Sequence, residues 1–139
     1  MAFAARGLIL AAPASGSGKT IVTLGLLRCL ARQAVEVTPI KVGPDYIDPV
    51  FHEMASGRPC RNLDTWAMRA STVTQGVVDA SAKGSVIICE GVMGLFDGAR
   101  GVEPKRNGST ASLARETGWP VILVVDAAAQ AASAAAVVR

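Results

Sequence analysis

The sequence predicts an α/β fold in which a mostly parallel sheet is covered by helices on both faces. Short runs of Val, Ile and Leu alternate along the chain with stretches of helical periodicity, as in right-handed strand–helix–strand units. Hydrophobic residues make up 50% of the 139 residues, but aromatic residues only 4%. This mix suits parallel strands that are buried on both faces by small-residue helices.

The N-terminal third supplies a strand, a helix and a second strand. Residues 7–12 (GLILAA) form an apolar run that ends in turn residues, so we expect a buried strand. Apolar side chains recur at helical spacing over residues 19–34, which predicts an amphipathic helix. Residues 36–42 alternate and favour a second strand, which ends at Gly43-Pro44 because both residues are poor members of a ladder.

A short helix is expected next. Asp48-Pro49 is typical of a helix start, with Asp as the cap and Pro at the first helical position. We therefore expect a helix over residues 48–56 that ends at Gly57. No period is recognisable over residues 58–69, which are expected to be irregular.

The centre of the chain continues the alternation. Residues 72–83 predict a helix that Gly84 closes, although Gly76 is unusual inside a helix. Residues 85–89 (SVIIC) predict a third buried strand, and residues 91–108 a long Gly-rich loop.

The last elements are a capped helix, a strand and an Ala-rich helix. Ser109 is expected to cap a helix through residue 117, and residues 121–125 (VILVV) predict a fourth strand. Alanine is the strongest helix former, so residues 128–138 predict a final helix. The chain stops inside this pattern at Arg139, without a stop signal, so we expect a truncated domain.

The most specific motif is the loop PASGSGKT at residues 13–20. It lies between a predicted strand and a predicted helix, the context that a P-loop requires. Glycines let backbone N–H groups surround phosphate oxygens, a Lys can reach the β- and γ-phosphates, and a Thr hydroxyl can bind Mg²⁺. Pro13 replaces the first Gly of the usual pattern, but the context outweighs this departure. The motif predicts a P-loop NTPase-like fold with ATP and Mg²⁺ as cofactors. The predicted nucleotide-binding residues are Ser15, Gly16, Ser17, Gly18, Lys19 and Thr20.

Carboxylates follow two of the predicted strands. Glu90 ends the strand beside the P-loop, where a second Mg²⁺ contact is expected. Asp45 has no evident structural role and is the better metal candidate, whereas Asp48 serves either as a helix cap or in function. Lys41 can neutralise a carboxylate or a phosphate. Asp97, in GLFDG, is either a functional residue or a turn residue.

Other chemistry is less favoured. His52 is the only histidine, and a lone helical His cannot build a relay or a metal cluster, so catalysis by His52 is not favoured. Three cysteines, Cys29, Cys60 and Cys89, form no CxxC pair; we expect buried, reduced thiols and a cytoplasmic location. The net charge of +3 is scattered, which argues against nucleic acid as a partner. No uncharged stretch is long enough to cross a membrane.

The segments APASGSGKT, KVGPDYIDPVFH, NLDTW, EGVMGLFDG, GSTASLA and VVDA occur in one order. Together, over residues 7–138, they closely resemble the N-terminal domain of the cobyrinic (or hydrogenobyrinic) acid a,c-diamide synthases, glutamine-dependent amidases of cobalamin biosynthesis. The wider kinship is with dethiobiotin synthetase and cobyric acid synthase. The resemblance implies an ATP-dependent ligase that phosphorylates the a- or c-acetate group of a corrinoid. Ammonia, supplied free or from glutamine, then displaces phosphate from the acyl phosphate to give the amide.

The resemblance also implies a role for each motif residue. The implied Mg²⁺ ligands are Thr20, Asp45 and Glu90. The implied catalytic residues are Lys19, Lys41, Asp48 and Asp97. The implied substrate-binding residues are Tyr46, Asp48, Asp97, Ser109 and Thr110.

The family enzymes end in a glutamine amidotransferase domain, and nothing in residues 1–139 supplies it. We therefore expect a partial dethiobiotin synthetase-like ATP-binding domain that is inactive alone and that either self-associates as a homo-oligomer or is only marginally stable. Two alternatives stay open. A dethiobiotin synthetase-like ligase would also activate a carboxylate, although the GPDYID segment argues against it. A partitioning-type switch ATPase, which makes no product, carries a signature Lys where this chain has Ala14.

Overall fold

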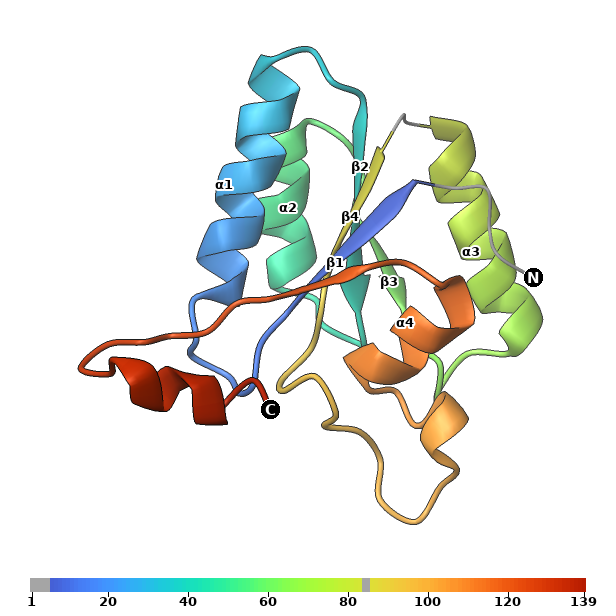
Figure 1. Ribbon diagram of the computed structural model, residues 1–139. Helices are drawn as coiled ribbons and strands as arrows, with labels where there is room; N and C mark the ends of the chain where they lie inside the picture. The colour runs from blue at the N-terminus through green and yellow to red at the C-terminus, as the bar shows by residue number, and fades with distance from the viewer. Residues whose placement is uncertain (1–5, 84–85) are drawn as a thin grey trace.

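The computed structural model describes residues 6–83 and 86–139. Its five strands form one sheet in the order β3-β2-β4-β1-β5 (Figure 1). Every neighbouring pair of strands is parallel, which confirms the predicted fold class. The strands are β1 (Gly7–Ala11), β2 (Val37–Val42), β3 (Arg61–Leu63), β4 (Val86–Glu90) and β5 (Val121–Leu123).

Helices cover both faces of this sheet. Helices α1 and α2 lie on one face, and α3 and α4 lie on the other (Figure 1). The α-helices are α1 (Lys19–Arg32), α2 (Asp48–Ser56), α3 (Ala70–Lys83) and α4 (Thr110–Thr117); the short 3-10 helices are η1 (Pro104–Arg106) and η2 (Ala132–Ala136). None of the helices in the described part of the chain is both long and apolar enough to cross a bilayer.

The core consists of two apolar layers, one on each side of the sheet. Ile9 and Ile87 belong to the layer with α3 and α4, whereas their neighbours Leu10 and Ile88 belong to the layer with α1 and α2. Successive strand residues point to opposite faces, so one apolar run fills both layers. This is why β1 and β4 read as continuous hydrophobic segments rather than as alternating ones.

The predicted elements correspond closely to the observed ones, with one strand missed. Gly57 ends α2 with a φ of 71°, as expected for a glycine C-cap. Gly84 and Ser85 lie outside the described residues. Residues 61–63, which we expected to be irregular, form β3 and pair with β2 from Ile40↔Arg61 to Val42↔Leu63. A strand of three residues is too short to show a period, so only its pairing reveals it.

The prediction of a final α-helix was wrong. Only the 3-10 helix η2 forms there, and none of its residues is buried. Alanine propensity alone stabilises a short helix poorly, because most helix stability in proteins comes from packing an apolar face. Residues 128–138 are exposed except for the half-buried Ala134, so this segment buries no apolar face.

The cysteines are only partly as expected. Cys89 is buried in β4, Cys60 is half-buried and Cys29 is exposed. The buried positions of α1 are Lys19, Thr23 and Leu27, spaced by four residues along one stripe. Cys29 lies off this stripe, so the prediction that it is buried was wrong.

Candidate nucleotide-binding site

The loop between β1 and α1 has the backbone shape of a phosphate cradle. Gly16 and Gly18 have φ values of 83° and 85°, in the left-handed region that favours glycine. Apart from the adjoining residues, no atom of the described part of the chain lies within 4 Å of a Cβ built at either glycine. The glycines are thus needed for conformation, and the space beside them is open. The Ser17 hydroxyl donates to the Ala14 carbonyl at 2.9 Å inside the loop.

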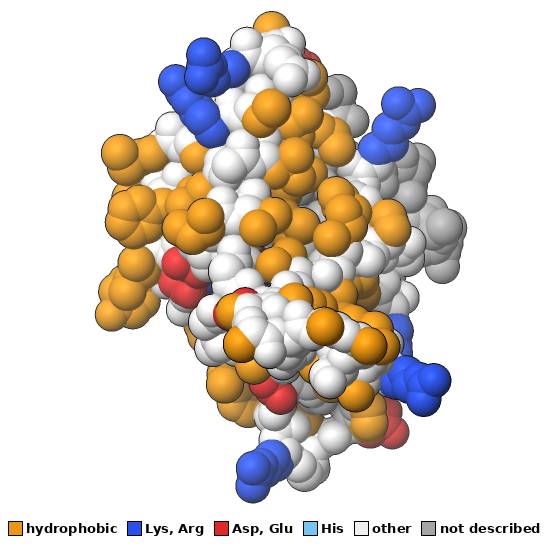
Figure 2. All heavy atoms as spheres, turned by 60° about the vertical axis from the view of Figure 1, so that its left-hand side comes forward, with side chains coloured by type: hydrophobic (Ala, Val, Ile, Leu, Met, Phe, Trp, Pro, Cys, Tyr) orange, Lys and Arg blue, Asp and Glu red, His pale blue; other side chains and the backbone are white. Residues whose placement is uncertain are grey.

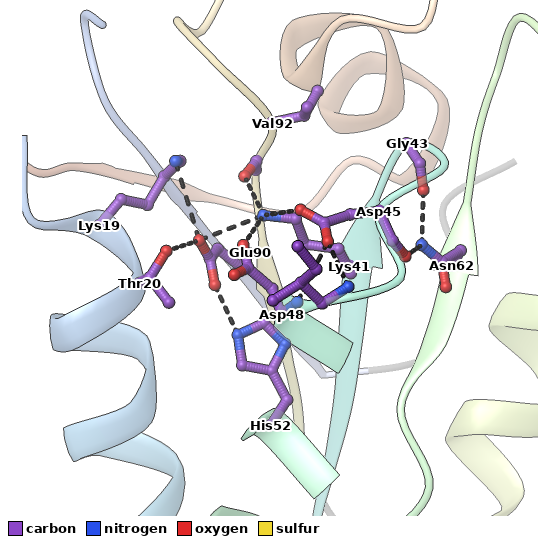
Figure 3. Close-up of polar contacts among 12 residues, drawn as sticks. Lys19, Thr20, Lys41, Gly43, Asp45, Asp48, His52, Asn62, Glu90 and Val92 are labelled. Atoms are coloured by element: carbon purple, nitrogen blue, oxygen red, sulfur yellow. Dashed lines mark hydrogen bonds and ion pairs between the residues drawn. The ribbon is translucent and has the colours of Figure 1, made fainter. Parts of the chain in front are cut away.

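The first two residues of α1 reach the end of β4. The Thr20 hydroxyl donates to Glu90 Oε1 at 2.6 Å, and Lys19 Nζ lies 3.8 Å from the same oxygen (Figure 3). Burial lowers the pKa of Lys19 and outweighs the opposing attraction of Glu90. The start of a helix also carries partial positive charge. The geometry therefore suits an anion on the loop with oxygen ligands beside it.

Glu90 is the centre of the site. It is fully buried, and both of its carboxylate oxygens have partners. His52 Nε2 lies 2.5 Å from Oε2, while Oε1 accepts from Thr20 and from Lys41 Nζ at 3.2 Å. Burial alone would raise the pKa of Glu90, but hydrogen bonds from His52 and Thr20 and the charge of Lys41 lower it. Glu90 is therefore ionised at neutral pH.

Lys41 lies among three carboxylates. Its Nζ is 2.7 Å from Asp48 Oδ2, 3.2 Å from Glu90 Oε1 and 3.7 Å from Asp45 Oδ2. It also donates to the Gly91 carbonyl at 3.2 Å. Burial pulls the pKa of Lys41 down, but the hydrogen bond to Asp48 and the charge of Glu90 raise it above its ordinary value. The ammonium group thus keeps its charge in a buried position.

Of the two aspartates of the GPDYID segment, Asp45 is the one that bonds backbone N–H groups at the start of α2, and Asp48 is the one that pairs with Lys41. Asp45 Oδ1 accepts the backbone N–H groups of Ile47 and Asp48, at 2.8 and 3.1 Å, and so shapes the entry to α2. These bonds lower the pKa of Asp45 against the effect of its partial burial. Asp48 makes no side-chain cap, and its carboxylate pairs with Lys41 instead. Asp45, for which we expected no structural role, therefore has one, and of the two alternatives for Asp48 the helix cap is the one that does not form. A cap depends on how the loop folds back and not on composition.

Strand β3 supports this turn. Asn62 Nδ2 donates to the carbonyl oxygens of Gly43 and Asp45 at 2.7 and 2.6 Å (Figure 3). Gly43 has a φ of 83°. The missed strand therefore holds the chain in position where it leaves β2.

The remaining predicted residues lie around the rim or beneath it. Tyr46 is 83% exposed. Asp97 is exposed and its Oδ2 accepts the Gly94 N–H at 2.8 Å, which closes a turn. Ser109 and Thr110 are buried; Ser109 caps α4, and the Thr110 hydroxyl accepts the Val92 N–H at 2.9 Å. The contacts of Asp97, Ser109 and Thr110 are structural, and substrate roles for these three residues and for Tyr46 stay predictions.

Sequence reasoning missed His52. Its side chain is fully buried and contacts Glu90, although we expected no role for it in the site. It follows Asp48 by four residues, so both lie on the same face of α2. That spacing was the available signal.

The residues present fit a hard divalent cation through oxygen atoms. In residues 6–83 and 86–139, no group of three or more His, Cys, Asp or Glu side chains has the arrangement of a metal site. Mg²⁺ bound to a nucleotide needs fewer protein ligands, because phosphate oxygens and water molecules complete its coordination shell. The adjacent oxygens of Thr20 and Glu90 match that requirement, whereas Asp45 is joined to them through Lys41.

A parallel sheet, a glycine loop at a helix start, and a Lys, a Thr and a carboxylate beside that loop define a P-loop nucleotide-binding protein. Residues 8–138 match the family described as CobQ/CobB/MinD/ParA nucleotide binding domain. The chain belongs to this family.

Curated relatives share this region at high identity. Hydrogenobyrinate a,c-diamide synthase of Rhizobium meliloti (strain 1021) is 53% identical over 132 residues, which cover 95% of this chain and 30% of that protein. The protein of the same name from Brucella ovis is 53% identical over 136 residues, covering 96% and 30%. That of Rhodobacter capsulatus is 50% identical over 131 residues, covering 94% and 30%. The chain spans 30% of the length of these relatives.

Proposed function

We propose that this chain is the ATP- and Mg²⁺-binding part of a hydrogenobyrinate or cobyrinate a,c-diamide synthase. Relatives that carry the first name match 95% of the chain at 53% identity. The observation that carries the proposal is the convergence of the P-loop and the GPDYID segment on one buried carboxylate. Thr20 and Lys41 both bond Glu90 Oε1, and Asp48 bonds Lys41.

The proposed reaction activates a carboxylate of the corrinoid. An oxygen of the a- or c-acetate group attacks the γ-phosphorus of ATP, and ADP leaves with the electron pair of the broken P–O bond. Ammonia, supplied free or from glutamine, then attacks the acyl carbon of the acyl phosphate. Phosphate leaves, the nitrogen loses a proton, and an amide remains. The first step brings two anions together, so positive charge must be placed between them.

The chain's own residues meet this demand. Lys19 and the N–H groups of the loop bind the phosphates, and Lys41 supplies a retained positive charge near the attacking carboxylate. Asp48 orients Lys41 at 2.7 Å. Thr20 and Glu90 would hold Mg²⁺, which would neutralise phosphate charge, and Asp45, on the far side of Lys41, is proposed to contribute a carboxylate to the same cation. Tyr46 and Asp97, exposed at the rim, are proposed to contact the substrate.

The remaining parts of the proposal concern the larger protein. We propose that residues 1–139 are part of a dethiobiotin synthetase-like domain, that glutamine hydrolysis belongs to a separate amidotransferase domain, and that the enzyme is cytoplasmic.

Nucleotide binding tests the first half of the proposal. Lys19→Ala removes the charge that clamps the phosphates, so the affinity of the chain for a fluorescent ATP analogue should fall by about tenfold or more. Arg28→Ala, on the exposed side of α1, is the matched control and should bind like wild type. Equal affinity in Lys19→Ala and wild type would refute the P-loop assignment.

A chimera tests the second half. The aligned segment of the Rhizobium meliloti synthase is replaced by residues 8–138 of this chain, and the product of hydrogenobyrinic acid, ATP and glutamine is examined by mass spectrometry. We expect a diamide, and none from the same chimera carrying Lys19→Ala. A folded chimera that binds ATP but forms no amide would contradict the proposed substrate.

A further inference from the structure

The fully buried His52 has a specific place next to the site. It lies on α2, and its Nε2 is 2.5 Å from Glu90 Oε2. Figure 3 shows the contact with Glu90. The other ring nitrogen, Nδ1, lies 3.6 Å from Cys60 Sγ. None of the roles assigned above uses this side chain, although both of its nitrogens have partners.

The direction of these hydrogen bonds follows from the partners. Glu90 is ionised, with Lys41 at 3.2 Å, and a carboxylate can only accept. His52 Nε2 therefore carries a hydrogen and donates it. Burial raises the pKa of the Cys60 thiol to about 12, so the thiol keeps its hydrogen and can donate to Nδ1. The donors run in one direction, from Cys60 through His52 to Glu90.

In this arrangement the two carboxylate oxygens of Glu90 have different hydrogen-bond partners. Oε2 is held by His52, while Oε1 is left to Thr20 at 2.6 Å, Lys41 at 3.2 Å and Lys19 at 3.8 Å. Without the His52 donor, Oε2 would be buried without a partner. Lys41 Nζ could then attract both oxygens, and the carboxylate would turn away from Thr20.

We propose that His52 is a positioning residue that holds Glu90 with Oε1 facing Thr20, where a nucleotide-bound Mg²⁺ is expected. The inference rests on the proposed ATP and Mg²⁺ binding. Donors behind a ligating carboxylate commonly orient it, and their loss costs about 10–100-fold in metal affinity.

The first test is the Mg²⁺ dependence of nucleotide binding. His52→Leu keeps most of the buried volume and removes the donor. The Mg²⁺ concentration that half-saturates binding of a fluorescent ATP analogue should rise by about 10–100-fold, while binding in EDTA stays as in wild type. Ser56→Ala is the matched control, because Ser56 is buried on the same helix and contacts the His52 carbonyl but makes no bond to Glu90. It should leave the Mg²⁺ dependence unchanged.

A second test needs neither metal nor a variant at position 52. Because the sequence has a single histidine, its ring nitrogens give unambiguous ¹⁵N NMR signals in the metal-free chain. We expect the hydrogen on Nε2, and an altered Nε2 signal in Glu90→Gln. A ring with its hydrogen on Nδ1 alone would overturn the inference.

The outcomes separate the two proposals. A folded His52→Leu with unchanged Mg²⁺ dependence would overturn the positioning role and leave the proposed function in place. Wild-type chain that binds the nucleotide equally with and without Mg²⁺ would remove the metal role, and the positioning role with it. In the Glu90→Gln background, His52→Leu should add no further change, because its effect passes through Glu90.

Discussion

At the scale of single residues, one carboxylate sets the electrostatics of the site. Glu90 is the Cα partner of Lys41 in the register of β4 on β2, and of Leu10 in the register on β1. The central position of β4 thus brings a buried anion next to a buried cation. Breaking such a pair by removing one charge costs more than the pair itself contributes, because the remaining charge stays desolvated.

The pKa of Glu90 is lower in the folded chain than in a free side chain, which fixes the sign of its effect on stability. Its contribution is fully present above the unfolded pKa of about 4.3 and is lost as the pH falls through the folded value. Glu90→Gln should lower the free energy of unfolding by about 3 kcal/mol at pH 7. This deficit should shrink in acid, where wild-type Glu90 also becomes neutral.

Urea unfolding at a series of pH values measures this difference. A deficit that stayed constant down to the acid transition would show that the loss comes from packing and not from the charge of Glu90. Loss of stability that grew in acid would contradict the direction of the pKa shift.

At the scale of elements, the space beside a glycine differs sharply between β1 and α1. A Cβ at Gly7 of β1 would lie 2.2 Å from Trp119 Cε2, and the Trp119 ring is buried. Gly25 of α1 is exposed, and nothing lies within 4 Å of a Cβ placed there. The same substitution should therefore have opposite effects at these two positions.

Gly7→Ala is expected to lower the free energy of unfolding by about 1–3 kcal/mol, because the rigid ring must move. Gly25→Ala should raise it by up to about 1 kcal/mol, since alanine favours the helix. Thermal unfolding of both variants beside wild type checks the pair. Stabilisation by Gly7→Ala would mean that Trp119 does not pack against β1.

At the scale of the whole molecule, apolar surface stays exposed. Figure 2 shows hydrophobic side chains across the middle of one side of the molecule, with Lys and Arg mainly at its margin. Ile21 of α1 is 74% exposed and Ile122 of β5 is 48% exposed. β5 is also an edge strand of the sheet. Edges and apolar patches of this kind promote association.

We therefore expect the 139-residue chain to sediment as a concentration-dependent mixture of species. Ile122→Lys places a charge on the edge strand and should shift the mixture toward the monomer. Val102→Lys, at an exposed position away from the sheet edge, should leave it unchanged. A wild-type chain that is strictly monomeric at every concentration would contradict this expectation.

Much of the fold could be predicted because its signals are local. Apolar runs predicted β1, β4 and β5, alternation predicted β2, and Ser109 caps α4 as expected, accepting from Ser112 N–H. β3 could not be predicted, because its three residues owe their conformation to pairing with β2. The prediction of a final α-helix failed for the opposite reason. Its residues have high helix propensity, but none of those in η2 is buried, so packing does not stabilise a helix there.

The sequence by itself determined the nucleotide-binding class, because a P-loop is contiguous: glycine conformations, a lysine and a threonine act within residues 13–20. It also placed Glu90, Lys41 and Asp48 at strand ends and a helix start. Only the tertiary structure decided which of these side chains meet. The order β2-β4-β1 pairs Lys41 with Glu90, and the packing of α2 brings His52 to the same carboxylate. Such partnerships join residues up to 70 positions apart, and strand order and register fix them where local propensity cannot.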